Sequence, residues 1–523
     1  MTKINLLSAR FARNGFTSLV GWLGLIFCLA GGIARPASEP LVAPQSANPG
    51  SNRTTELFDF DWKYHAGDGV RPELPDYDDH DWQTVQLPHD ATIGAAPVNG
   101  GGKSGRWNGF MPRNCGWYRK SFTLAQPLGM DHMVIEFEGV YRDAEVWLNG
   151  HHLGRWLNGF LDFSIDLTDQ LQPGTNILAV RYDNRFTNSS RWYMGEGIYR
   201  HVWLKRFAPV HVAEDGQFIT AGDLGSSSAT IRIESEIRNE WRAATNVDVT
   251  VDVLAPDGSQ VGQVRGVTWV PPQSVQRLVL TTSIKAPQLW DVTNPCLYRA
   301  QTTLRVGGQI RDRCTETFGL RQLSFSPAHG LLLNGRKVFL QGVNLHDDLP
   351  GVGTAAFDRA IDRRLETLKS LGVNAVRLAH NPHARHFLDA CDRLGLLVFD
   401  EAYDKWSEQY YGPGAHFAEL WPADLAAFMR RDRNHPSVFI WSVGNEPLGQ
   451  QLAGPDTADG ALLERMLTLA RAWDPTRPAT AALYPARQDG IKWNQKGYGQ
   501  SAPHSLAFLP EVASVNYQSG FFA

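Results

Sequence analysis

The hydrophobic and polar positions divide the chain into three parts with different periods. From residue 59 to about 207, short apolar runs are separated by turns rich in Gly, Asn, Asp and Pro. Residues 144–148 alternate apolar and polar side chains and end at Asn149-Gly150, which predicts a two-residue hairpin. Residues 176–182 predict a further strand. An all-strand segment of this size predicts a β-sandwich of the jelly-roll type.

The second part, residues 208 to about 322, has a stricter period of two. Apolar positions alternate through 230–237 and 247–253, and Gly307-Gly308 separates two further runs as a hairpin turn. About 115 residues of this kind predict an immunoglobulin-like sandwich.

In the third part, residues 323–523, short apolar strands alternate with stripes of helical period. Two helical stripes end at Gly372 and Gly395, as helix C-caps do. Repeated β-α units predict parallel strands with right-handed crossovers, and therefore a (β/α)8 TIM barrel of which about six strands are present. We expect these strands over residues 337–343, 373–378, 396–399, 438–443, 479–483 and 512–515.

The first residues have the pattern of an export signal. Lys3, Arg10 and Arg13 precede an apolar core, and small residues end the segment at Ala34. We interpret residues 1–34 as a signal peptide, 35–53 as a linker rich in Pro, Ser and Asn, and 54–207 as the first domain. The expected localisation is secreted or periplasmic, with no membrane attachment after cleavage.

Composition limits the function classes. The net charge is −4 with no basic patch, so a nucleic-acid partner is not expected. The 17 Trp residues are typical of sugar binding, because pyranose C–H faces pack on aromatic rings, but also of β-sandwich cores. After the signal segment four cysteines remain, and their irregular spacing favours thiols over a zinc site or a disulfide framework. They are Cys115, Cys296, Cys314 and Cys391.

The stretch from Arg430 to Pro447 carries the strongest chemical signal. Its apolar run over 438–443 predicts a strand buried on both faces, which then delivers Asn445 and Glu446. In a TIM barrel, catalytic groups lie at the carboxyl ends of the strands, which is where this carboxyl group is expected. Glu446 is therefore a candidate general acid, and a capping carboxylate at a turn is the alternative.

The motif RDRNHPSVFIWSVGNE resembles the acid/base signature of the family-two glycoside hydrolases, the β-galactosidase and β-glucuronidase family. The resemblance implies that Glu446 is the acid/base and that Asn445 contacts the sugar 2-hydroxyl. Phrases at 116–120, 137–154 and 191–204 resemble the family's amino-terminal sugar-binding domain.

Other strand ends supply the remaining candidate residues. The resemblance implies sugar contacts for His346 and His380, although a lone histidine is more often a hydrogen-bonded structural residue. Arg377 either orients a carboxylate in the barrel mouth or forms an ion pair in the barrel floor. The loop residues Asp404 and Trp406 resemble the pocket loop of galactosidase-like members.

Three further residues complete the predicted site. Tyr517 is expected to bind substrate, and Asn516 and Trp441 to support the site. The loop reads Asp404-Lys405-Trp406 where magnesium-dependent members carry a Glu-x-His pair, so no metal and no cofactor is predicted.

Retaining hydrolysis needs a second carboxylate. The resemblance places this nucleophile after a seventh strand, and we find no matching residue in the sequence. Glu401 is the nearest carboxylate, with a supporting role expected and a replacement nucleophile as the alternative.

The sequence therefore predicts a β-galactosidase-like enzyme that is incomplete and inactive as given, through truncation, a frameshift or a missing partner piece. A non-catalytic carbohydrate-binding protein is the competing interpretation, and a homo-oligomer is possible in either case.

Overall fold

The computed structural model describes residues 53–98, 108–124, 128–185, 192–407, 411, 416–447, 458–483, 506 and 509–516. The predicted signal peptide, nearly all of the predicted linker, and Tyr517 lie outside these ranges. Within the described ranges, no helix combines the length and the apolar character that a membrane crossing requires.

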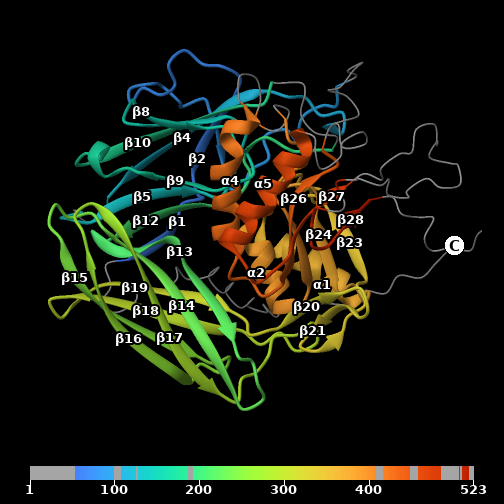
Figure 1. Cartoon of the computed structure of the whole chain (residues 1–523). Coiled ribbons are helices and arrows are strands. Elements are labelled where there is room, and N and C mark those ends of the chain that lie inside the picture. The colour runs from blue at the N-terminus through green and yellow to red at the C-terminus, as the bar shows by residue number, and fades with distance from the viewer. Residues whose placement is uncertain are drawn as a thin grey trace, which may run out of the picture. The chain divides into compact units, whose positions relative to one another are not determined.

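The first domain is a sandwich of two antiparallel sheets (Figure 1). A small two-stranded ribbon, β6 and β11, accompanies them. One sheet has the order β1-β12-β5-β9 and the other β3-β2-β4-β10-β7-β8. Alternate side chains of both sheets meet in one core, in which Trp62, Tyr118 and Phe137 are fully buried. The strands are β1 Thr54–Leu57, β2 Trp62–Ala66, β3 Gln83–Val85, β4 Cys115–Thr123, β5 His132–Phe137, β6 Val140–Tyr141, β7 Ala144–Leu148, β8 His151–Trp156, β9 Phe163–Asp166, β10 Thr175–Asp183, β11 Gly197–Ile198 and β12 Val202–Phe207.

The second domain is also a sandwich, with sheets β13-β14-β17 and β16-β15-β18-β19. Its core follows the period of two, since Val247, Val249, Val251 and Val253 all point inward while the residues between them face outward. The strands are β13 Val210–Gly222, β14 Ser228–Asn239, β15 Thr245–Leu254, β16 Gln260–Val270, β17 Ser274–Lys285, β18 Tyr298–Val306 and β19 Gln309–Phe318.

The third domain contains a six-stranded parallel sheet in the order β23-β24-β25-β26-β27-β28. Its helices pack on the outer face of the strands in one large apolar cluster, where α4 and α5 lie beside β26 and β27 (Figure 1). The elements are β23 Gly342–Leu345, α1 Asp358–Ser370, β24 Ala375–Leu378, α2 Arg385–Leu394, β25 Leu397–Glu401, α4 Phe417–Asp432, β26 Val438–Asn445, α5 Ala458–Trp473, β27 Ala479–Leu483 and β28 Ser514–Val515.

The expected fold class is confirmed: two β-sandwiches precede a curled half barrel of six parallel strands. The described cysteines are all free thiols; Cys115 and Cys391 are buried, and the other two are partly exposed.

The prediction of one strand over residues 337–343 is wrong. Arg336–Lys337 form β22 in a small antiparallel sheet with β20 (Leu323–Ser326) and β21 (Gly330–Leu333), and the barrel strand begins only at Gly342. The side chain of Asn374 accounts for the break: it donates to the Phe339 carbonyl (2.9 Å) and accepts from the Gln341 amide (2.8 Å). These backbone groups are therefore unavailable for pairing with β24, and Phe339 is 77 % exposed.

Candidate active site

Strand β26 delivers Glu446 to the carboxyl edge of the parallel sheet, as the sequence predicts. All eight residues of β26 are buried. The chain turns sharply after it, because Glu446 has a φ of 45°, in the left-handed region that costs a side-chain-bearing residue energy. The Glu446 amide donates to the Ala482 carbonyl (2.8 Å), and the Asn445 amide to the Asp404 carbonyl (3.0 Å). These two bonds hold the turn and with it the direction of the carboxyl group.

Asn516 and Asn445 form an amide cluster beside the Glu446 carboxyl group. Asn516 Nδ2 donates to Glu446 Oε1 and to Asn445 Oδ1, each at 2.9 Å. Asn445 Oδ1 also accepts from Arg377 Nη2 (2.8 Å), while its Nδ2 donates to Asp404 Oδ1 (2.9 Å). Because both ends of the Asn445 amide have partners, its orientation is fixed.

Glu401, at the end of β25, holds Arg377, which in turn bonds to Asn445 of this cluster. It is fully buried, and its two oxygens accept from Arg377 Nη2 (2.9 Å to each), from His380 Nδ1 (2.6 Å) and from Ser442 Oγ (2.7 Å). Burial alone would raise the pKa of Glu401. The Arg377 charge and the hydrogen bonds from His380 and Ser442 outweigh it, so the pKa lies below its ordinary value and the group is a carboxylate.

An aromatic wall lines one side of the site. The Trp192 ring stacks on His346, with centroids 4.6 Å apart, and meets His380 edge-on at 5.4 Å. His346 Nδ1 donates to the Ala379 carbonyl (2.5 Å), and burial, with the nearby His380, lowers the pKa of His346. His346 is thus neutral at pH 7 with Nε2 as an acceptor, which suits a sugar hydroxyl.

Trp192 comes from the first domain, and hydrogen bonds to the barrel domain hold its segment in place. The neighbouring Tyr193 hydroxyl donates to Asp90 (2.7 Å to Oδ2), and Asp90 Oδ2 also accepts the Thr354 amide (2.8 Å). A side chain of the first sandwich therefore takes part in the site of the barrel.

The loop after β25 forms the other side. Lys405 Nζ donates to Asp404 Oδ1 (3.0 Å) and to the Asn445 carbonyl (2.7 Å). Trp406 Nε1 donates to the Val443 carbonyl (2.8 Å), and its ring lies against the Gly444 backbone, where a Cβ would come within 2.9 Å of Cε2. Gly444 therefore permits the close approach of the Trp406 indole.

The structure brings nearly all the predicted residues together: Glu446, Asn445, Asn516, Arg377, Glu401, His346, His380, Asp404 and Trp406. Trp441 does not join them. It points to the helix side, where Nε1 donates to Asp474 (2.9 Å) and the ring packs edge-on against Phe428, because Ser442 takes the inward position.

Three contributions were missed from the sequence: Trp192, Ser442 and the positioning bonds of Lys405. Trp192 lies in the segment 191–204, whose resemblance to the family's amino-terminal domain indicated the fold but no residue of the barrel site. Nothing in its immediate neighbours signals a contact with His346, more than 150 positions further along the chain.

Among the described residues, one group has the donor types of a metal site: Asp389, Asp392 and His435, whose ligand atoms lie within 4.8 Å of one another. His435 Nδ1 donates to Asp392 Oδ2 (2.6 Å), and Asp392 Oδ1 accepts the Ser437 amide (2.9 Å). Burial lowers the pKa of His435, but the Asp392 charge outweighs it and raises that pKa to about 9. These bonds tie α2 to the segment that precedes β26.

Comparison with known protein families finds three adjacent matches. Residues 109–212 match the glycosyl hydrolase 2 galactose-binding domain-like family, residues 210–321 match glycosyl hydrolases family 2, and residues 328–484 match the TIM barrel domain of glycosyl hydrolases family 2.

Individual relatives agree with these matches. The β-galactosidase BoGH2A of Bacteroides ovatus is 36 % identical over 84 % of this chain and 55 % of its own length. A putative β-glucuronidase of Formosa agariphila is 34 % identical over 76 % of this chain and 38 % of its own length. A crystal structure of a glycosyl hydrolase family 2 member from Bacteroides cellulosilyticus superposes with a TM-score of 0.78 at 32 % identity, over 83 % of this chain and 56 % of that one. The chain thus spans about half the length of these relatives, or less.

Proposed function

We propose that this chain, which belongs to glycosyl hydrolase family 2, serves the hydrolysis of terminal β-glycosides, with β-galactosides as its preferred substrates. The relatives named β-galactosidase and β-glucuronidase support the β-glycoside class. The preference for galactosides rests on the pocket loop with Asp404 and Trp406 and on relatives named β-galactosidase, such as BoGH2A.

The observation that carries this proposal is the position of Glu446. It follows a fully buried strand at the carboxyl edge of the sheet, and Asn516 donates to its carboxyl group. In the proposed mechanism, protonated Glu446 gives its proton to the glycosidic oxygen while the bond from that oxygen to the anomeric carbon breaks. The resulting Glu446 carboxylate then takes a proton from the water that attacks the anomeric carbon.

A retaining reaction also needs a carboxylate about 5–5.5 Å from the first, which bonds to the anomeric carbon as the glycosidic bond breaks and is released when water attacks that carbon. Glu401 does not suit this role, because it is fully buried and its oxygens accept from three side chains. We propose that the nucleophile comes from outside the part of the chain that the structure describes.

The remaining side chains would bind the terminal sugar. Asn445, with its amide held in one orientation, would contact the 2-hydroxyl, and His346 and His380 would contact neighbouring hydroxyls. The apolar face of the sugar would lie on Trp192 or Trp406. We further propose that residues 1–34 direct export of the protein.

Two readouts on the polypeptide of residues 1–523 test this assignment. The first is turnover of aryl β-galactosides and aryl β-glucuronides, and the second is binding of a non-hydrolysable thio-β-galactoside, followed by tryptophan fluorescence. We expect saturable binding that Asn445→Ala weakens, and no turnover from this polypeptide alone. Turnover that Glu401→Gln abolishes while the folded variant still binds the thio-β-galactoside as the parent does would make Glu401 the nucleophile. Binding without turnover, by this polypeptide and by any longer form of the protein that can be expressed, would favour a carbohydrate-binding protein.

A further inference from the structure

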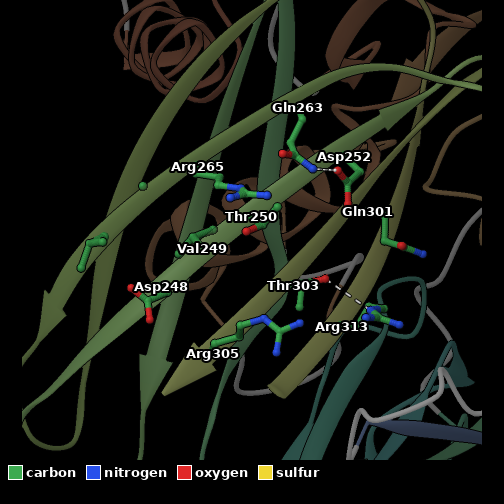
Figure 2. A pocket seen from close by; sticks show the side chains of 12 residues that line it. Asp248, Val249, Thr250, Asp252, Gln263, Arg265, Gln301, Thr303, Arg305 and Arg313 are labelled. Atoms are coloured by element: carbon green, nitrogen blue, oxygen red, sulfur yellow. Dashed lines mark hydrogen bonds between the residues drawn. The ribbon is translucent and has the colours of Figure 1, made fainter. Parts of the chain in front are cut away.

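The second domain carries a groove on the outward face of its four-stranded sheet, apart from the residues of the candidate active site (Figure 2). Its volume of about 670 Å³ lies in the range of small-molecule sites. The groove crosses strands β16, β15, β18 and β19, and most of the residues that line it occupy outward-facing positions of these strands; Val249 and Gly266 are the exceptions.

The strand register arranges these side chains in rows across the sheet. The central row is Arg265, Thr250, Thr303 and Arg313, with a guanidinium at each end and two hydroxyls between them. Three gaps between neighbouring strands at 4.7–4.9 Å give this row a width of about 14 Å.

A row of hydrogen-bonding groups lies on one side of the central row, and a row of mixed character lies on the other. Gln263, Asp252 and Gln301 form the first, and Val267, Asp248 and Arg305 form the second.

The polar groups of the groove satisfy few of one another's hydrogen bonds. Gln263 donates to Asp252 Oδ1 (2.6 Å), and Arg313 Nε donates to the Thr303 hydroxyl (3.3 Å), as Figure 2 shows. Within the described ranges, the side chains of Asp248 and Arg265 form no hydrogen bond or ion pair, although Asp248 lies opposite Arg305. The groove therefore presents hydrogen-bond donors and acceptors, and charged groups of both signs, to solvent.

An exposed indole extends the same face. Trp269 lies two positions beyond Val267 on β16, so its side chain lies on the same face of the sheet as the groove. It is 58 % exposed, and Val267 is 63 % exposed. The two side chains therefore place apolar surface, including a large ring, on the same face as the polar groups of the groove.

We propose that this groove binds an oligosaccharide segment of a glycan, with one sugar stacked on Trp269 and the hydroxyls of the next sugars bonded to the central row. Sugars combine apolar C–H faces with hydroxyls that both donate and accept, and the groove offers a counterpart to each. Three guanidiniums and two carboxylates leave it close to neutral, which disfavours a polyphosphate chain. The groove would hold a polymeric substrate on the protein, a role separate from hydrolysis at Glu446.

The test is affinity electrophoresis of the full chain in gels that contain soluble β-1,4-galactan or glucuronoxylan, as neutral and acidic probes. Methyl β-galactoside, present at saturating concentration, occupies the barrel mouth so that only binding elsewhere is scored. We expect at least one polymer to retard the protein, and Arg265→Ala and Trp269→Ala each to raise the Kd for that polymer about tenfold. The polymer that is bound distinguishes a neutral from an acidic glycan.

Arg242→Ala is the matched control, because Arg242 is an exposed arginine of the same domain outside the groove. It should leave the retardation unchanged. The proposal is overturned if neither polymer retards the protein, or if Arg265→Ala and Trp269→Ala both bind as the parent does. Loss of retardation in His380→Ala alone would assign the binding to the barrel mouth and overturn it as well.

Discussion

Glu401→Gln tests the electrostatic anchor beneath the candidate active site. The substitution keeps the shape of the side chain but removes its charge, and it replaces one carboxylate oxygen by an NH₂ group. That NH₂ must face a donor, because Arg377, His380 and Ser442 all donate to the two oxygens of Glu401. Arg377 is then left in a largely buried site without its counter-charge.

The expected cost follows from this geometry. Removing one partner of a buried ion pair costs about 3–5 kcal/mol. The loss of one or two charge-assisted hydrogen bonds, at about 1.5–3 kcal/mol each, gives the same magnitude. Arg377 and His380 also lose the group that holds them beside Asn445, so binding of a thio-β-galactoside should weaken together with stability.

Urea unfolding of the 523-residue chain at pH 7 measures this cost. Glu366→Gln is the matched control, since Glu366 pairs with Arg359 on the surface, where such pairs contribute about 0.2–1 kcal/mol. The pKa of Glu401 is lower in the folded protein than its ordinary 4.5, so its stabilisation is complete above that pH and is lost as the pH falls through the folded value. The difference between parent and variant should therefore shrink in acid. A cost at pH 7 below about 1 kcal/mol would refute the anchoring role.

Three further predictions concern other parts of the chain. Gly444→Ala should displace the Trp406 indole and weaken binding of the thio-β-galactoside in a fluorescence titration, whereas Gly222→Ala, which meets no atom within 4 Å, should not. Burial lowers the pKa of His201, but hydrogen bonds to two aspartates outweigh it and raise that pKa from 6.5 to about 10, so the stabilisation is complete below pH 6.5 and is lost by pH 10. His201→Gln should therefore lower the melting temperature at pH 6 and have little effect at pH 10, as a thermal series would establish. Intact mass of the protein exported by a secreting host should place its amino terminus near Arg35, and a chain that retains residues 1–34 would contradict the export signal.

Much of the fold and part of the site follow from local pattern. The run over 438–443 predicts β26 because every position in it is apolar or small, and Glu446 is recognisable because it directly follows such a strand. Because both faces of this strand are buried, the pattern does not indicate which side chains point into the barrel. Trp441 was therefore taken as part of the site, although Ser442 occupies the inward position.

The features that the sequence did not predict depend on partners distant in the chain. Trp192 joins the site because the first domain bonds to the barrel, as Asp90 does at Thr354. The strand expected over 337–343 breaks because the side chain of Asn374 takes its backbone hydrogen bonds. Neither contact leaves a periodic signal, since each is a single pairing between separate segments.

The most direct measurement is single-turnover cleavage of two aryl β-galactosides by protein that carries the proposed nucleophile and by its Glu446→Gln variant. One substrate carries a poor phenol leaving group and the other a dinitrophenol, which departs without a proton. If Glu446 is the general acid, the variant should cleave the first about 10²–10⁴-fold more slowly and lose far less with the second. Equal losses on both substrates would contradict the assignment of Glu446 as the acid.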